Sequence, residues 1–286
     1  MSLDSIIASK IFTEFCLRFL KKSRLSCHDP ISFYDENMNI LAIIPARMGS
    51  SRFPGKPMAE ILGKPMIGHV YERVSACNLL TKTIVATCDK EIANYIKYIG
   101  GQAIMTSNKH ERASDRCAEA LVSLEEQDGV QYDIVVMVQG DEPMTHQNMI
   151  TEAVTPMLND LNILVVNLMA RIQTLEEFKD KNCIKVVCDQ QKNAIYFSRE
   201  PIPTCGNKLD FVMNKQVCII PFRRDFLFKY TNLKPTPLEI SESIDMLRII
   251  ENGMKVRMIP TKYETHAVDT KIDLLKVEKM MRSHSF

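Results

Sequence analysis

A loop rich in glycine, proline and cations follows the first strongly apolar run of the chain. The run Ile40–Ile44 predicts a buried strand, and residues 45–57 after it hold two Gly, three Pro, two Arg and one Lys. Small residues let backbone N–H groups turn toward one point where cations also gather, which is the chemistry of a phosphate-binding loop. A Walker A loop fits poorly, because five residues separate the two glycines and Pro57 follows Lys56 in place of Ser or Thr. The alternative, an ordinary basic surface loop, is less consistent with this density of Gly, Pro and cations.

Two carboxylates that follow apolar runs are candidates for a metal site. Residues 132–138 predict a central strand covered on both faces, and the strand ends in Gln-Gly-Asp-Glu-Pro at 139–143. The glycine permits a sharp turn and the proline directs the chain outward, so Asp141 is expected at the carboxyl edge of a sheet, facing the phosphate loop. Asp269 follows another short apolar run and is interpreted as a second acidic strand end. Magnesium takes one or two carboxylates together with substrate phosphates, so the pair predicts a Mg²⁺ site.

The order of predicted elements indicates an α/β protein with a doubly wound, mostly parallel sheet. Ligands of such sheets bind outside the carboxyl ends of the strands, which is where the phosphate loop falls. The first half predicts strands at 40–44, 83–87, 103–106 and 132–138, and helices across 67–77, at 90–99 and from Ala113. The second half predicts strands at 163–168, 184–189, 194–199, 215–222 and 256–259, one helix from about Pro237 through Arg248, and a last helix at 271–282.

The composition excludes several classes of protein. The net charge of +1 over 286 residues argues against a general nucleic-acid binder. No stretch approaches the roughly 18–20 apolar residues of a membrane span. The nine cysteines include no C-x-x-C pair, which favours reduced, buried thiols in a cytoplasmic protein over a disulfide framework or a zinc site.

Residues 1–37 stand apart from the rest of the chain. Ile7, Ile11, Phe15 and Phe19 recur at every fourth residue and predict an apolar helix face. Charges interrupt this pattern, so a signal peptide is not expected. The segment is interpreted as an added helix or an over-long gene start, with a membrane-surface or partner helix as the alternative. Residues 38–286 are expected to form a single domain.

The loop at 41–57 resembles the nucleotide-binding loop of sugar nucleotidyltransferases, and most of all that of the 3-deoxy-manno-octulosonate cytidylyltransferases, which are CMP-sugar synthetases. The resemblance runs from about Met38 to about residue 280. It includes Gln-Gly-Asp at 139–141, Ile-Lys-Val-Val at 184–187, Tyr-Phe-Ser-Arg at 196–199 and Val-Asp-Thr at 268–270. It implies a Rossmann-like nucleotidyltransferase fold with a smaller β-rich portion for sugar binding and dimerisation, and a cytoplasmic homodimer.

The same resemblance implies a reaction and a set of roles. A sugar hydroxyl would attack the α-phosphate of CTP and release pyrophosphate, giving a CMP-sugar for lipopolysaccharide or another surface polysaccharide. Arg47, Lys56 and Asp141 would be catalytic, and Asp141 and Asp269 would hold Mg²⁺. The expected substrate contacts are Gly49, Ser50, Arg52, Ser114, Arg116, Gln139, Arg199, Gln216 and Glu242. Helix capping is the alternative role of Ser114, and a solvated surface charge is that of Arg199 and Glu242.

One segment departs from the family pattern His-x-Gly-Ile-Tyr-x-Tyr-Arg. Gln216 stands where the family has His, and Ile220 where it has Tyr. Both positions are expected on the sugar side, which predicts a pocket altered at one end, as a modified octulosonate would require. A CMP-nonulosonate synthetase, a nucleotidyltransferase with another nucleotide or acceptor, and a binding protein without turnover are the alternatives. Retention of Arg47, Lys56, Asp141 and Asp269 argues against the last.

We expect a chain that starts at Met38 to fold and to keep the activity of the full chain, because the first predicted strand and every candidate site residue lie beyond it. Circular dichroism and a pyrophosphate-release assay on the two chains check this. An insoluble or inactive shorter chain would show that residues 1–37 are structural.

Overall fold

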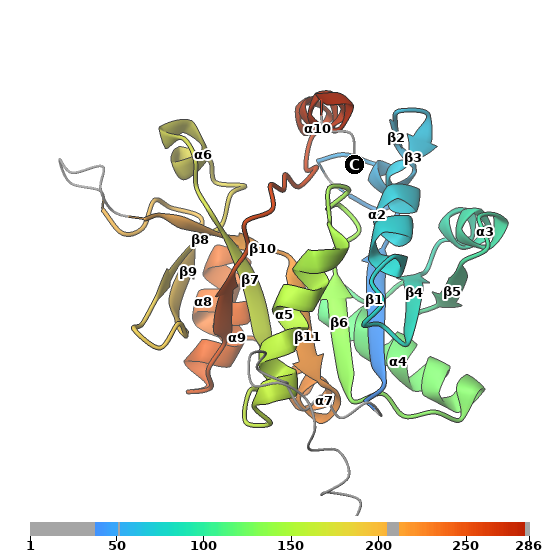
Figure 1. The fold of residues 1–286 in the computed structure, drawn as a ribbon, viewed down its shortest axis with the longest axis horizontal. Coiled ribbons are helices and arrows are strands. Elements are labelled where there is room, and N and C mark those ends of the chain that lie inside the picture. Colours follow the sequence, from blue (N-terminus) through green and yellow to red (C-terminus); the bar gives the residue numbers. More distant parts are fainter. Residues whose placement is uncertain (1–37, 51, 205–211, 284–286) are drawn as a thin grey trace, which may run out of the picture. The chain divides into compact units, whose positions relative to one another are not determined.

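The structure is a computed structural model that describes residues 38–50, 52–204 and 212–283. The helix predicted within residues 1–37 lies outside the described residues. The described part is built around two five-stranded sheets (Figure 1). None of its helices is long and apolar enough to cross a membrane.

The first sheet has the strand order β11-β6-β1-β4-β5 and carries the phosphate loop at the end of β1. Strands β6, β1, β4 and β5 are parallel, and β11 joins β6 in the antiparallel sense. The bounds are β1 Ile40–Ala46, β4 Lys82–Thr87, β5 Gln102–Met105, β6 Ile134–Val138 and β11 Ile219–Arg223. The predicted mostly parallel sheet is confirmed.

Both faces of the first sheet are covered, as the apolar runs of its strands require. Alternate residues of β1 enter two separate cores, since Leu41 and Ile43 belong to one and Ala42 and Ile44 to the other. Helices α4 and α7 pack on the first face, and α2, α3 and α5 on the second. Their bounds are α2 Met66–Ser75, α3 Lys90–Tyr98, α4 Ala113–Asp128, α5 Gln147–Asn159 and α7 Arg224–Thr231. The sheet is therefore doubly wound, as predicted.

The second sheet, with the order β12-β7-β10-β8-β9, is the β-rich portion. Its strands β12 and β7 pair in parallel, whereas the other neighbours pair in the antiparallel sense. The strands are β7 Val166–Arg171, β8 Lys185–Cys188, β9 Ala194–Ser198, β10 Asn214–Val217 and β12 Arg257–Pro260. The remaining elements are η1 Lys56–Met58, β2 Glu60–Ile61, β3 Lys64–Pro65, α6 Leu175–Lys179, α8 Pro237–Glu242, α9 Met246–Glu251 and α10 Lys271–Ser283.

Three element predictions were wrong in detail. The strand predicted at 215–222 is two strands, β10 and β11, and they belong to different sheets with Cys218 between them. The helix predicted through Arg248 is two helices, because Ser243 adopts a left-handed conformation with φ of 53° and ends α8. The strand predicted from Ile163 begins at Val166, since the Ile163 amide donates to the Asp160 carbonyl in a turn (3.2 Å). Apolar spacing shows burial, but it does not show where a chain changes sheet or direction.

A buried ion pair fixes α8 and α9 against each other. Arg248 is 3% exposed and donates from Nε and Nη2 to the two carboxylate oxygens of Glu239, at 2.7 and 2.6 Å. Glu239 is fully buried, and the guanidinium also lies 5.0 Å from the centre of the Tyr230 ring. Removing one partner of such a pair leaves an uncompensated buried charge.

We expect Arg248→Met to lower the free energy of unfolding by up to about 3–5 kcal/mol, because the buried Glu239 then loses both hydrogen bonds of its ion pair and keeps only the more distant Arg112 guanidinium, at 3.5 Å. The double variant Arg248→Met/Glu239→Leu should recover much of that loss, since no charge stays buried. Urea unfolding followed by circular dichroism measures both. The matched control is Arg282→Met, which breaks an exposed i,i+4 pair with Glu278 (2.7 Å) and should change stability by less than about 1 kcal/mol. Equal unfolding midpoints for the two single variants would contradict this account.

Candidate active site

The phosphate loop leaves the carboxyl end of β1 and folds back on itself. The Gly55 amide donates to the Met48 carbonyl at 3.0 Å, and Gly55 has a left-handed φ of 73° that suits glycine. The Met48 amide donates in turn to Oδ2 of Asp89 at 2.8 Å, which fastens the loop to the end of β4. Lys56 follows directly and begins η1. The backbone that leads into Lys56 is thus held by two hydrogen bonds, one to a backbone carbonyl and one to the side chain of Asp89.

The ammonium group of Lys56 lies between two carboxylates. Its Nζ is 2.6 Å from Oδ2 of Asp141 and 3.5 Å from Oδ1 of Asp269. Burial alone would lower the pKa of Lys56, but the charges of Asp141 and Asp269 and their hydrogen bonds outweigh it and raise that pKa. Arg52 adds a second cation, because its Nη2 lies 2.9 Å from Oδ1 of Asp269. Two residues separate Asp141 from the end of β6 at Val138, and Asp141 faces the loop, as the sequence predicted.

The backbone brings the two carboxylates together. The Val268 amide donates to the Asp141 carbonyl at 2.9 Å, so the segment carrying Asp269 is bonded to the end of β6. The interpretation of Asp269 as a strand end was wrong, since β12 ends at Pro260 and Asp269 lies just before α10. Asp269 is held there because its amide donates to Oδ2 of Asp273 at 3.2 Å.

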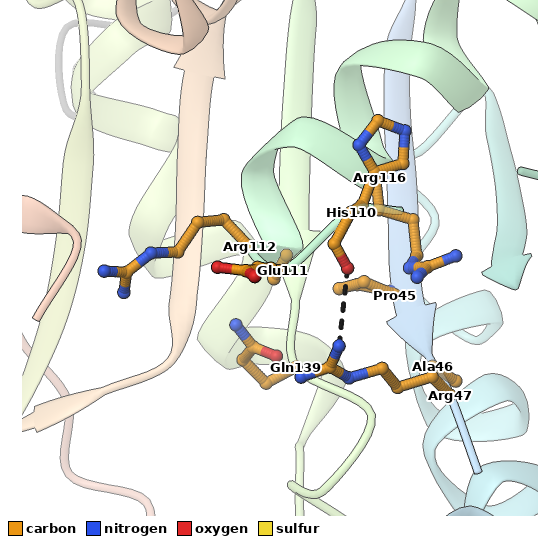
Figure 2. Close-up of a pocket in the computed structure, with 9 residues that line it drawn as sticks. Pro45, Ala46, Arg47, His110, Glu111, Arg112, Arg116 and Gln139 are labelled. Carbon is orange, nitrogen blue, oxygen red and sulfur yellow. Dashed lines mark hydrogen bonds between the residues drawn. The ribbon is translucent and has the colours of Figure 1, made fainter. Parts of the chain in front are cut away.

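A first hollow, of about 200 Å³, is lined by the end of β1, the start of α4 with the residues before it, and the residue that follows β6 (Figure 2). Arg47 and His110 both line it, and Arg47 donates from Nη1 to the His110 carbonyl at 3.4 Å. Arg116 is 3% exposed and donates from Nη1 to Oγ1 of Thr106 at 2.5 Å. Its Nη2 is buried and has no hydrogen-bond partner among the described residues. An unmet buried donor is costly, so a small movement of the side chain that brings Nη2 to a ligand acceptor in this hollow would be favourable. We name this the base-side hollow; its lining is Pro45, Ala46, Arg47, His110, Glu111, Arg112, Ala113, Arg116 and Gln139.

A second hollow of about 360 Å³ lies over the phosphate loop. Its lining includes most of the predicted loop contacts together with the candidate catalytic residues: Arg47, Gly49, Ser50, Arg52, Lys56, Gln139 and Asp141. An added Cβ at Gly49 would meet nothing within 4 Å, so the backbone there is open to a ligand. Ser50 lies in the loop with its Oγ accepting from the Phe53 amide at 3.3 Å.

A third hollow, of about 440 Å³, opens between the two sheets, and we name it the sugar-side hollow. Gln139 lines all three hollows, and Asp141 and Arg52 line the second and third. Shared lining residues make the three hollows neighbours in one cleft. The lining of the third is strongly charged and includes Arg52, Arg112, Asp141, Glu142, Glu177, Asp180, Arg199, Lys215, Gln216, Asp245, His266, Asp269 and Asp273.

The residues predicted on the sugar side have different positions. Gln216 lines the hollow and donates from Nε2 to Oδ1 of Asn167 at 2.6 Å. Arg199 also lines it, while its guanidinium donates to the carbonyls of Lys181 (3.0 Å), Glu242 (2.7 Å) and Ser243 (3.3 Å).

Glu242 supports this region from behind and does not line the hollow. Its carboxylate accepts from the Arg199 amide at 2.8 Å and from Oγ of Ser198 at 2.7 Å. Burial would raise the pKa of Glu242, but these hydrogen bonds outweigh it and hold that pKa below its usual value. Glu242 therefore holds Arg199 in position and does not itself face the sugar-side hollow.

Two further expectations need correction. Ile220 is 3% exposed, pairs with Met137 and packs in the core, so it is not on the sugar side. It is the second residue of β11, whereas Cys218, just before that strand, lines the hollow. Ser114 is not a helix cap either, since Arg112 holds the N-cap position of α4 and Ser114 is buried inside the first turn. The prediction of a pocket altered by Ile220 is therefore not supported. Of the two residues that depart from the family pattern, only Gln216 lines the sugar-side hollow.

Sequence reasoning missed several charged residues of the cleft. Glu142 is 4% exposed, and burial raises its pKa to about 7, although the hydrogen bond from Oγ1 of Thr265 (2.5 Å) favours the charged form and lowers it.

Two ion pairs in the cleft were also missed. Nζ of Lys215 lies 2.5 Å from Oε1 of Glu177. Arg112 pairs with Asp245 at 2.7 Å, and burial raises the pKa of that carboxyl although the guanidinium opposes the shift. Glu142 could have been noticed within its motif, but nothing in the sequence links Arg112 to Asp245.

Within the described residues there is no group of three or more His, Cys, Asp or Glu side chains that could hold a metal ion. Asp141 and Asp269 are two carboxylates whose oxygens already converge on one cation, the Lys56 ammonium. Hard oxygen donors of this kind fit Mg²⁺ when substrate phosphates and water complete its shell. The residues present therefore fit a magnesium ion that shares its coordination with a ligand.

Comparison with known proteins first defines the class. A solved structure of 4-diphosphocytidyl-2C-methyl-D-erythritol synthase from Anaerococcus prevotii is 17% identical, covers 86% of this chain and 96% of that chain, and has a TM-score of 0.56. This likeness shows a shared α/β fold. A structure of CMP:2-keto-3-deoxy-manno-octonic acid synthetase complexed with CTP is 37% identical over 86% of this chain and 99% of that chain, with a TM-score of 0.77. The architecture is that of the nucleotidyltransferases.

The family follows from the sequence comparisons. A family model described as cytidylyltransferase matches residues 41–256. The 3-deoxy-manno-octulosonate cytidylyltransferase of Geobacter metallireducens is 43% identical over 257 residues, which cover 86% of this chain and 99% of that protein. The protein of the same name from Geotalea uraniireducens is 42% identical over 256 residues, 86% of this chain and all of that one. The chain belongs to the cytidylyltransferase family, and the predicted resemblance is confirmed.

We expect Arg116→Lys to weaken CTP binding and raise the KM for CTP by about tenfold or more, because a lysine lacks the planar fork in which Nη1 bonds to Thr106 while Nη2 remains for another acceptor. Steady-state kinetics with CTP varied at a fixed sugar concentration measure this. Arg282→Lys, at an exposed position far along α10, is the matched control. An unchanged KM for CTP in Arg116→Lys would remove this guanidinium from base recognition.

Proposed function

We propose that this protein couples CTP to 3-deoxy-manno-octulosonate and gives the CMP-sugar and pyrophosphate. The observation that carries the proposal is the convergence of Lys56, Asp141 and Asp269 where the hollow over the phosphate loop meets the sugar-side hollow. Two similar proteins bear the name 3-deoxy-manno-octulosonate cytidylyltransferase, and one solved relative is complexed with CTP, which supports the same reaction.

In this proposal the base of CTP occupies the base-side hollow. Arg116 lines this hollow and its Nη2 has no partner among the described residues, while a cytosine offers a carbonyl and a ring nitrogen as acceptors. Pro45 and Ala46, at the end of β1, form the apolar wall against which a flat ring can lie. Arg47 joins this hollow to the next, so it is placed near the first phosphate groups.

The triphosphate lies over the phosphate loop. Arg47, Arg52 and Lys56 supply fixed positive charge, and the open backbone at Gly49 allows close approach. Charge neutralisation and in-line placement, more than covalent catalysis, are what transfer of a phosphoryl-type group requires. A hydroxyl oxygen of the sugar forms a bond to the α-phosphorus, and the bond from that phosphorus to the pyrophosphate oxygen breaks.

Asp141 and Asp269 would hold Mg²⁺ in the bound state, with Lys56 turned to the phosphates. The ion would neutralise phosphate charge and lower the pKa of the attacking hydroxyl. The two aspartates have the further task of orienting Lys56 and Arg52, since both cations bond to them.

The sugar acid occupies the sugar-side hollow. Arg199, Lys215 and Gln216 line it and offer donors for a carboxylate and hydroxyls. Gln139 lies where the hollows meet and can orient the reacting end of the sugar. The family resemblance further supports a cytoplasmic homodimer that activates a sugar for lipopolysaccharide or another surface polysaccharide.

A pyrophosphate-release assay tests the proposed function. CTP, UTP, ATP and GTP are each combined with 3-deoxy-manno-octulosonate, an amino-substituted octulosonate and a nonulosonate, with Mg²⁺ present. We expect the highest kcat/KM with CTP and an octulosonate. A higher value with the nonulosonate, or no release with any pair, would overturn the assignment.

We expect Asp141→Asn and Asp269→Asn each to reduce Mg²⁺-dependent turnover by at least about 100-fold while the fold stays intact. Each change keeps the side-chain shape but removes the charge that a magnesium ion requires. The assay is pyrophosphate release over a Mg²⁺ titration, with circular dichroism as the check on folding. Asp128→Asn, at a surface pair with Lys82, is the control. Near-normal turnover of either variant would exclude that residue from the metal site.

A further inference from the structure

A lysine that bonds to backbone carbonyls is buried beneath the sugar-side hollow. Lys185, the first residue of β8, is 0% exposed, yet it does not line any hollow described above. Its Nζ donates to the carbonyls of Asp180 (2.8 Å), Cys183 (2.7 Å) and Arg199. An ammonium group has three donors, so these three backbone carbonyls use all of them.

The buried ammonium group of Lys185 is energetically costly, so some contribution to structure or function must offset that cost. Taking an ammonium group out of water is expensive, and the hydrogen bonds that Lys185 makes within the described chain go to neutral carbonyls, with no carboxylate among them. An apolar side chain would fill the same volume without that cost. The hydrogen bonds of Lys185 instead fix the relative positions of two segments, residues 180–183 and Arg199.

Both segments bear on the site. Asp180, Cys183 and Arg199 all line the sugar-side hollow. The same short loop carries Asn182, whose Oδ1 accepts from Nη1 of Arg52, a cation of the phosphate loop. Lys185 therefore holds, through its hydrogen bonds, residues that line the sugar-side hollow. Through Asn182 the same loop also contacts Arg52 of the phosphate loop.

Arg199 is held from two directions. Lys185 bonds to its carbonyl, while Glu242 accepts from its amide at 2.8 Å. The guanidinium then reaches back to the carbonyl of Lys181 within the same loop, at 3.0 Å. This closed set of bonds leaves Arg199 few other orientations, and loss of the ammonium group would release both the loop and the arginine.

We infer that Lys185 is a positioning residue for recognition of the sugar acid, acting through Arg199 and the loop 180–183 without touching substrate. The inference rests on the proposed function. Its specific consequence is a larger effect on the sugar acid than on CTP. The base-side hollow shares no residue with this set of bonds, and Arg52, the one residue of the set on the triphosphate side, keeps its ion pair with Asp269 at 2.9 Å.

The test compares Lys185→Met with the wild-type enzyme and with Lys179→Met, an exposed lysine of α6. We expect the KM for 3-deoxy-manno-octulosonate to rise roughly tenfold or more, since small misplacements of positioning groups have effects of that size. The KM for CTP should stay within about twofold. Lys185→Gln, whose amide can still donate to two carbonyls, should lie between the wild-type enzyme and Lys185→Met.

A purely structural role gives a different result. Loss of folded protein lowers the apparent kcat, but it leaves both KM values where they were, because KM does not depend on enzyme concentration. Unchanged KM for the sugar acid in Lys185→Met, or failure of both Lys185 variants to fold, would assign Lys185 to the core and overturn the inference. Absence of turnover in the wild-type enzyme would instead contradict the proposed function itself.

Discussion

The site depends on one cation held between two carboxylates. Asp141 and Asp269 come from distant parts of the chain, and two negative charges so close would repel each other in a partly buried cleft. The Lys56 ammonium, 2.6 Å from one and 3.5 Å from the other, offsets that repulsion. Its position in turn requires the phosphate loop to fold back through Gly55 and the Val268 amide to bond to the Asp141 carbonyl. Loop, strand end and C-terminal segment are thus arranged around a single charge.

The cleft exists because the chain passes from one sheet to the other at Cys218. β10 ends in the second sheet and β11 begins in the first, and the Cys218 carbonyl accepts from the Gln139 amide at 3.1 Å. Gln139, after the central strand, and Gln216, on the second sheet, consequently line the same hollow. In the proposed function, a nucleotide site at the carboxyl edge of a parallel sheet would therefore adjoin an acceptor site on a mostly antiparallel one.

Much of the nucleotide half could be predicted from the sequence because it is local. The run Ile40–Ile44 is a continuous apolar strand, the loop follows at once, and Asp141 stands just beyond another buried strand. The sugar half depends on contacts between distant residues, which periodicity does not encode. Ile220 is one example, since only its register with Met137 shows that it faces the core. Lys185 is another, because its three acceptors are backbone carbonyls, and these leave no pattern in residue types.

The central claim is that the position shared by Asp141 and Asp269 is a cation site for the triphosphate. A crystal structure with CTP and Mn²⁺ in place of Mg²⁺, recorded at the manganese absorption edge, tests it most directly. The account predicts an anomalous peak bonded to oxygens of both aspartates and of the triphosphate, with the Lys56 ammonium on the phosphates. A manganese ion bound away from both carboxylates, or a triphosphate that does not reach Lys56, would contradict it.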